Sequence, residues 1–255
     1  MTAGVHMEAG AAAGAAGSGP PEIAVEGLTK VFGRRQVLRD VSFRAERGGF
    51  LSIFGPNGAG KTTILRVLAT LLSPTAGSVA VAGHDVREDA MAVRRQIGLV
   101  SHSPLLYLDL TAYENLRFYA DMYGLADREA RIDELLARVE LGHRRNDVVR
   151  TFSQGMRQRL AIARAVLHRP RVLLLDEPHS GLDPRAGDIL DGMLAEIRAE
   201  HTFVMVTHNI EKGLELATQV MIVDGGKVVF ASQGGIDAAA FKAVYREHVR
   251  AGSVA

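Results

Sequence analysis

The stretch of sequence that decides the fold is Gly55-Pro56-Asn57-Gly58-Ala59-Gly60-Lys61-Thr62-Thr63. It matches the pattern G-x-x-x-x-G-K-[ST], in which successive backbone N–H groups turn inward around an anion. An apolar, strand-like run at 50–54 enters this phosphate loop, and a helical pattern at 63–72 leaves it. An ordinary glycine-rich turn before a helix is the alternative, but it does not require Lys61 and Thr62 in register with both flanks. The stretch therefore predicts a binding site for a nucleoside triphosphate.

The residue types of the phosphate loop indicate how it would act. Glycines at positions 55, 58 and 60 leave the backbone free to approach phosphate, and the following helix adds its positive N-terminal end. Lys61 is expected to reach the β- and γ-phosphates, and the Thr62 hydroxyl to bind Mg²⁺.

The amino-acid composition limits the classes of protein to which the chain can belong. Hydrophobic residues make up 47% and charged residues 23% of the 255 residues, as in globular proteins. No run of about 20 apolar residues occurs, so we expect no membrane-spanning segment. The 30 basic and 29 acidic residues leave a net charge of +1 with no basic run, which disfavours a nucleic-acid partner. The absence of cysteine excludes disulfides, thiolate metal sites and cysteine nucleophiles.

The domain organisation follows from shifts in composition. The Ala/Gly-rich segment 1–22 is expected to be a disordered tail. One domain is expected at 23–235, with a helical subdomain inserted at about 104–150. Residues 236–255 are expected to form a short amphipathic helix and a tail, with the helix covering a sheet edge.

Strand patterns predict two kinds of sheet. Short segments bounded by glycine favour an antiparallel sheet beside the nucleotide, and they lie at 23–32, 37–45 and 78–82. From residue 171 onward, strands alternate with helices, which is typical of a parallel sheet covered by helices. The continuously apolar run 172–175 fits a strand that is buried on both faces. Thr111 and Glu114 form a capping box that opens a helix between these regions.

Two acids follow the apolar run. Asp176 is expected to hold the Mg²⁺ shell, and Glu177 to polarise a water in line with the γ-phosphate. Acids after a strand are weak evidence alone, but the phosphate loop earlier in the chain makes the pair a strong candidate for catalysis.

Two further segments could contact phosphate. The run Ser153-Gln154-Gly155-Met156 opens an amphipathic helix, and Ser153 as its N-cap would leave a second anion site at a helix N-terminus. His208 ends an apolar strand, and its imidazole can donate a hydrogen bond to a phosphate oxygen.

From about residue 23 to 232 the chain resembles the ATP-binding subunits of ABC transporters. The motifs that carry the resemblance are Walker A at 55–62, the signature at 152–156, Walker B at 172–176, the D-loop at Ser180-Gly181-Leu182-Asp183 and the switch histidine at His208. Glu177 falls on the family's catalytic glutamate, and Phe32 on the aromatic position that stacks on adenine. The resemblance implies an α/β fold with a P-loop NTPase core of the RecA type, an antiparallel β subdomain and an α-helical subdomain.

The resemblance also implies a mechanism and partners. Two ATP-binding subunits, identical or paralogous, would form a head-to-tail dimer with ATP and Mg²⁺ between the Walker A motif of one and the signature of the other. Hydrolysis would open this dimer and drive membrane-spanning subunits, which places the chain at the cytoplasmic face of the cell membrane.

The sequence departs from the family pattern at two places. The signature reads Ser-Gln-Gly-Met where the family norm is Ser-Gly-Gly-Gln, but Ser153 and Gly155 are kept. At the Q-loop, His102 stands where glutamine is expected. Imidazole titrates near neutral pH, so His102 could replace glutamine as the metal or water contact and make turnover sensitive to pH. The alternative is a variant with no added role.

A finer resemblance concerns the transported substrate. Segments 100–102, 105–107, 110–120 and 143–153 are similar to haem-exporter subunits of the cytochrome c maturation system, or to a broader clade of exporters that includes multidrug transporters. Two other classes of protein fit the sequence less well than an ABC transporter subunit does. A soluble ABC-type clamp usually carries two cassettes or a long coiled coil, and a module that does not hydrolyse ATP would not need both Glu177 and His208.

Overall fold

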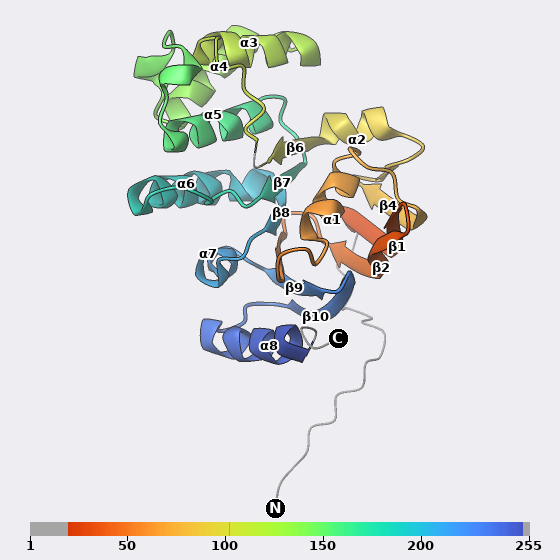
Figure 1. The fold of residues 1–255 in the computed structure, drawn as a ribbon. Coiled ribbons are helices and arrows are strands. Elements are labelled where there is room, and N and C mark those ends of the chain that lie inside the picture. The colour runs from red at the N-terminus through yellow and green to blue at the C-terminus, as the bar shows by residue number, and fades with distance from the viewer. Residues whose placement is uncertain (1–19, 102, 252–255) are drawn as a thin grey trace, which may run out of the picture.

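The computed structural model describes residues 20–101 and 103–251, which form two sheets and the helices around them (Figure 1). One sheet has six strands in the order β10-β9-β3-β8-β7-β6, and the other has four in the order β2-β1-β4-β5. Most of the tail expected at 1–22, and His102, lie outside the described residues. Glu22 belongs to the folded part, because it is 2% exposed and its carboxylate lies 2.8 Å from the Arg171 guanidinium.

The six-stranded sheet is parallel except for the edge strand β10, which pairs antiparallel with β9. Its strands are β3 (Phe50–Phe54), β6 (Ile97–Val100), β7 (Val172–Asp176), β8 (Thr202–Val206), β9 (Gln219–Asp224) and β10 (Lys227–Gln233). Strands β3 and β8 are buried at every residue, because helices or the second sheet cover both faces. The parallel pairings of β3 with β8 and of β8 with β7 confirm the predicted parallel sheet.

The four-stranded sheet is antiparallel, as predicted. Its strands are β1 (Ile23–Phe32), β2 (Arg35–Ala45), β4 (Ala76–Val81) and β5 (His84–Asp85). With α1 (Lys61–Leu68) and α2 (Ala90–Gln96), it encloses one hydrophobic core against the six-stranded sheet. Leu51 and Ile53 of β3 and Leu174 of β7 point into this core.

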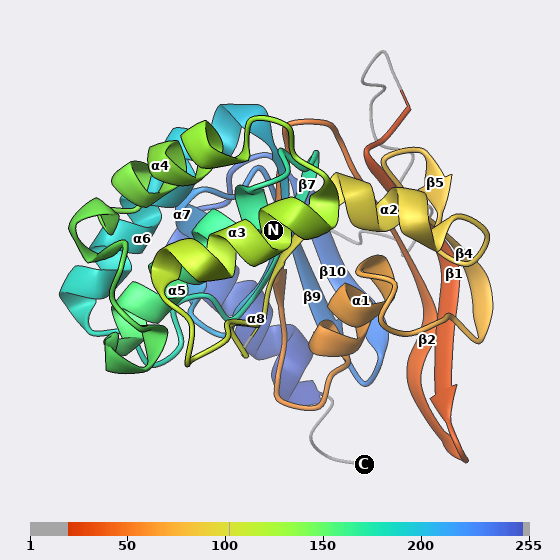
Figure 2. The ribbon, with the colours of Figure 1, turned by 90° about the horizontal axis from the view of Figure 1, so that it is seen from above.

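The opposite face of the six-stranded sheet carries a second core. The helices that build it are α3 (Ala112–Tyr123), α4 (Arg128–Arg138), α5 (Gln154–Val166) and α6 (Pro184–Ile197), seen to one side of the sheet in Figures 1 and 2. Leu173 and Leu175 point into it, so β7 alternates between the two cores. The capping box of Thr111 and Glu114 opens α3, as predicted. Short 3-10 helices lie at Gly142–Arg144, Val149–Thr151 and Arg198–Glu200.

The C-terminal helix packs on a face of the sheet. Helices α7 (Ile210–Glu215) and α8 (Ala238–Ala251) lie together against β3 and β9 (Figure 1). Phe241 is fully buried, and its ring centroid lies 4.7 Å from that of Phe54. The expectation that this helix covers a sheet edge is therefore incomplete: the helix contacts Phe230 of the edge strand β10, and it also covers the apolar face that Phe54, Val220 and Ile222 present. Within the described residues, we find no helix with the length and apolar character needed to cross a bilayer.

Candidate nucleotide site

The parallel strands deliver the candidate residues to one edge of the six-stranded sheet. The phosphate loop follows β3, Asp176 ends β7, and His208 comes two residues after the end of β8. Because β3, β8 and β7 are adjacent and parallel, their carboxyl ends meet, which is where open α/β sheets bind ligands.

The backbone of the phosphate loop depends on glycine. Gly55, Gly58 and Gly60 have φ angles of 149°, 82° and 107°. A Cβ atom at Gly55 would lie 2.0 Å from the Val223 carbonyl oxygen, and one at Gly60 would lie 2.6 Å from a Leu38 methyl carbon. Gly60 is the N-cap of α1, where no side chain caps the helix. The first N–H groups of α1 are therefore left for the loop or for a ligand.

Lys61 is held inside the loop that it follows. Its side chain is largely buried, and the ammonium donates to the carbonyl oxygens of Gly55 at 2.7 Å and Pro56 at 2.9 Å. Burial lowers the pKa of Lys61, while the nearby carboxylates of Glu177 and Asp176 act in the opposite direction. The ammonium thus sits between the loop and the acids, close to where a phosphate would enter the loop.

Thr62 and Asp176 present neighbouring oxygen atoms. The Thr62 hydroxyl donates to the Asp176 carboxylate at 3.2 Å, although the two residues come from different elements. Proteins commonly hold Mg²⁺ with one or two such oxygens, and substrate phosphates and water complete the coordination. The pair therefore fits the predicted Mg²⁺ site.

Glu177 and His208 contact each other. The His208 Nδ1 atom lies 2.8 Å from Glu177 Oε2, and the His208 backbone N–H lies 3.4 Å from the same oxygen. Glu177 has a φ of 52°, in the left-handed region, and its N–H donates to the Val206 carbonyl at 2.9 Å. Sequence reasoning gave the two residues separate tasks and missed their pairing, because only the adjacency of β7 and β8 brings them together.

The signature turn contacts the D-loop of its own chain. Ser153 caps α5 by accepting from the Met156 N–H, as predicted, and Asp183 caps α6 by accepting from the Ala186 N–H at 2.9 Å. The Gln154 side-chain amide donates to the Ser180 carbonyl at 3.0 Å. In the part of the chain that the structure describes, no side-chain hydrogen bond joins the signature turn to the phosphate loop. The fold therefore assembles the Walker motifs with Glu177 and His208, but not with the signature.

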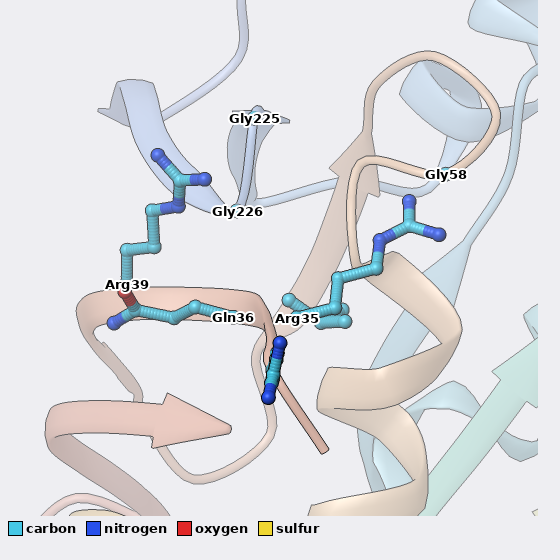
Figure 3. A pocket seen from close by; sticks show the side chains of 8 residues that line it. Arg35, Gln36, Arg39, Gly58, Gly225 and Gly226 are labelled. Atoms are coloured by element: carbon cyan, nitrogen blue, oxygen red, sulfur yellow. The ribbon is translucent and has the colours of Figure 1, made fainter. Parts of the chain in front are cut away.

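A basic pocket of about 520 Å³ adjoins the phosphate loop. Its lining residues are Arg34, Arg35, Gln36, Val37, Arg39, Gly58, Gly225 and Gly226. Arg35 extends toward Gly58, and Arg39 toward the turn of Gly225 and Gly226 (Figure 3). Phe32, at the end of β1, is 44% exposed. Sequence reasoning missed these arginines; the only signal was a pair of arginines two residues after Phe32.

Comparison with known proteins identifies the class. The family model described as ABC transporter matches residues 38–180. The chain belongs to this family and is an ABC ATPase domain. It is similar to a solved structure described as a dimeric post-hydrolysis state of the ATP-binding cassette MJ0796 bound to ADP and Pi. The TM-score is 0.76 and the identity 28%, over 83% of this chain and 98% of the other.

Two curated relatives are ATP-binding proteins named for resistance to daunorubicin or to linearmycin. The daunorubicin resistance ATP-binding protein DrrA3 of Streptomyces coeruleorubidus is 40% identical over 81% of this chain and 66% of its own length. The linearmycin resistance ATP-binding protein LnrL of Bacillus subtilis (strain 168) is 33% identical over 80% of this chain and 67% of its own length. The chain thus spans about two thirds of these relatives. The comparisons give no support to the finer resemblance to haem exporters.

Gly55→Ala and Gly58→Ala test whether the loop depends on the close approach to β9. Both substitutions put a side chain at a positive φ, which costs about 1–3 kcal/mol. Only at Gly55 does the new Cβ also meet a carbonyl oxygen, which adds about 1–3 kcal/mol, whereas nothing lies within 4 Å of a Cβ at Gly58. In urea denaturation, we expect Gly55→Ala to lower the free energy of unfolding by at least about 1 kcal/mol more than Gly58→Ala. Equal losses would contradict this packing.

Proposed function

We propose that the chain binds ATP with Mg²⁺ and hydrolyses it as the ATP-binding subunit of an exporter. The observation that carries the proposal is the Thr62–Asp176 contact beside the buried Lys61, with the Glu177–His208 pair at the same sheet edge. With these contacts, residues that follow three separate strands would provide a phosphate site, a metal site and a candidate base.

The proposed roles follow the geometry. The N–H groups of the phosphate loop and Lys61 would hold the β- and γ-phosphates, and Thr62 and Asp176 would hold Mg²⁺, which neutralises phosphate charge when bound. Glu177 would orient the attacking water. His208, with hydrogen on both ring nitrogens, would hold Glu177 through Nδ1 and donate to a phosphate oxygen through Nε2.

The nucleobase would lie on the side of the phosphate loop where the basic pocket opens. Phe32 is exposed enough to stack on adenine, and the arginines that follow it along the chain would add positive charge beside the phosphates.

A second ATP-binding subunit would complete the site. Ser153 and Gly155 lie at the N-terminus of α5, and the hydrogen bonds of their turn run to the D-loop rather than to the phosphate loop of the same chain. We infer that these residues, with Gln154 and Met156, meet the nucleotide of a partner subunit. The similar solved structure described as a dimer supports this arrangement.

An exposed apolar patch fits a membrane-spanning partner. Its residues lie on α3 and on the segment before it, and they are Leu105, Tyr107, Leu108, Phe118 and Met122, each 42–62% exposed. The rings of Tyr107 and Phe118 lie 5.0 Å apart, so the patch is continuous across the two segments. Exposed patches of this kind mark interaction sites. We propose that it docks membrane-spanning subunits at the cytoplasmic face of the membrane.

We propose amphipathic drug-like molecules as the exported substrates. The support is the similarity to DrrA3 and LnrL, which are named for resistance to daunorubicin and linearmycin. Haem export is the second candidate, and it rests only on the sequence resemblance in segments 100–120 and 143–153. His102 lies within this resemblance, and its role at the Q-loop stays a prediction.

Glu177→Gln tests the hydrolytic role. The amide keeps the shape of the side chain but cannot act as a base, so we expect ATP turnover to fall by about 100-fold or more. ATP affinity should stay within about threefold, because phosphate and metal contacts are kept. Steady-state phosphate release and ATP titration measure the two effects, with the exposed Glu88→Gln as the control. Unchanged turnover in Glu177→Gln would rule out the proposed hydrolysis.

Phe118→Asp tests the docking patch. A carboxylate there would be desolvated on docking, so we expect the variant to lose most of the integral membrane protein that co-purifies with the parent. Leu71→Asp is the control, because Leu71 is 59% exposed and lies three residues after the end of α1, outside the patch. Equal recovery of the membrane protein with both variants would place the docking surface elsewhere.

A further inference from the structure

A largely buried network joins the loop after Glu177 to the helix after His208. Its members are His179, Asp191 on α6 and Lys212 on α7. The His179 ring nitrogen Nε2 lies 2.6 Å from Asp191 Oδ1, and the Lys212 ammonium donates to Asp191 Oδ2. The side chains of His179 and Asp191 are only 12% and 13% exposed.

The surroundings of His179 define how its ring is used. A carboxylate only accepts, so Nε2 must carry the hydrogen that points to Asp191. The other ring nitrogen, Nδ1, is buried and has no hydrogen-bond partner among the described residues. The Nε2–H therefore holds the Asp191 carboxylate and fixes the orientation of the ring and of the loop that carries it.

Lys212 anchors the other end of the network. Its ammonium also lies 3.6 Å from Asp188 and from Glu215. The bond to Asp191 raises the pKa of Lys212, so the side chain stays charged. Helix α7 is thereby fixed to α6, next to which it lies in Figure 1.

The network and the Glu177–His208 contact close a ring. His179 comes two residues after Glu177, and α7 begins two residues after His208. The segment after β7 and the segment after β8 are therefore joined twice. Glu177 contacts His208 at 2.8 Å, and Asp191 connects His179 to Lys212. Glu177 has a φ of 52°, and a non-glycine residue keeps such a backbone only when its surroundings fix it.

Stability alone is a poor explanation for this network. A carboxylate taken out of water costs free energy that its ion pairs often only just offset, so buried ion pairs are weak evidence for stability. Catalysis, in contrast, is sensitive to displacements of about 1 Å in the groups that position a reactant. A network that fixes two loops against one helix serves the second purpose.

We propose that His179, Asp191 and Lys212 are positioning residues that hold Glu177 and His208 in their reactive arrangement. The inference rests on the proposed function of these two residues as the hydrolytic pair. It predicts that breaking the network slows ATP cleavage and leaves ATP binding intact.

The test compares His179→Leu with His179→Gln in the full chain. Leucine is apolar and cannot donate to Asp191, whereas the glutamine amide nitrogen can reach the position of Nε2 and donate. We expect kcat for ATP hydrolysis to fall about tenfold or more in His179→Leu, which corresponds to one lost hydrogen bond to a charged group. The KM for ATP should stay within about twofold in both variants, and His179→Gln should keep kcat within about threefold of the parent.

A second pair tests the other end of the network. Lys212 is partly exposed, so Lys212→Met should fold even if His179→Leu does not. We expect kcat to fall in Lys212→Met and to be largely kept in Lys212→Arg, which still donates to Asp191.

Three outcomes would overturn the inference. They are parental kcat in His179→Leu and Lys212→Met, equal losses in His179→Gln and His179→Leu, or a loss of activity that only follows the unfolded fraction at the assay temperature. Glu177→Gln, assayed in parallel, distinguishes a failure of the positioning proposal from a failure of the proposed ATP hydrolysis. If Glu177→Gln is inactive while His179→Leu matches the parent, only this inference fails; if Glu177→Gln is as active as the parent, the proposed function fails.

Discussion

The parallel pairing of β3, β8 and β7 is the constraint on which the rest of the structure depends. It places the phosphate loop, His208 and the acid pair at one edge of the sheet, although they are far apart in the chain. The Glu177–His208 contact joins the ends of the neighbouring strands β7 and β8, and the Thr62–Asp176 contact joins the start of α1, which follows β3, to the end of β7 across β8. A one-residue shift in the register of β7 would turn its side chains to the other face and disrupt both contacts, because both involve residues at the end of that strand.

Both the charges and the backbone conformation of the phosphate loop are fixed by neighbours at this edge of the sheet. Lys61 is buried against carbonyl groups with two carboxylates nearby, and Gly55 approaches β9 so closely that no side chain fits. Packing thus fixes the backbone around the phosphate loop, whereas the polar groups of the loop remain available to bind an anion. The apolar cores on both faces of the sheet hold this arrangement rigid.

Much of this architecture could be predicted because its signals are local in sequence. The phosphate loop, the capping box at Thr111 and the apolar strand before Asp176 each follow from a short run of residues. The contact between Glu177 and His208, the pocket arginines and the face on which α8 packs could not be predicted, because they depend on strand order. His179 was overlooked for the same reason: only the fold brings Asp191 and Lys212 to its ring.

The central claim is that Lys61, Thr62 and Asp176 form a site for ATP with Mg²⁺, and a calorimetric titration tests it most directly. ATP is titrated into the parent chain and into Lys61→Ala, each with and without Mg²⁺. The account predicts that Mg²⁺ strengthens binding to the parent, and that Lys61→Ala binds at least about tenfold more weakly. If Lys61→Ala bound ATP as tightly as the parent, and with the same response to Mg²⁺, the site described at this sheet edge would not be the nucleotide site.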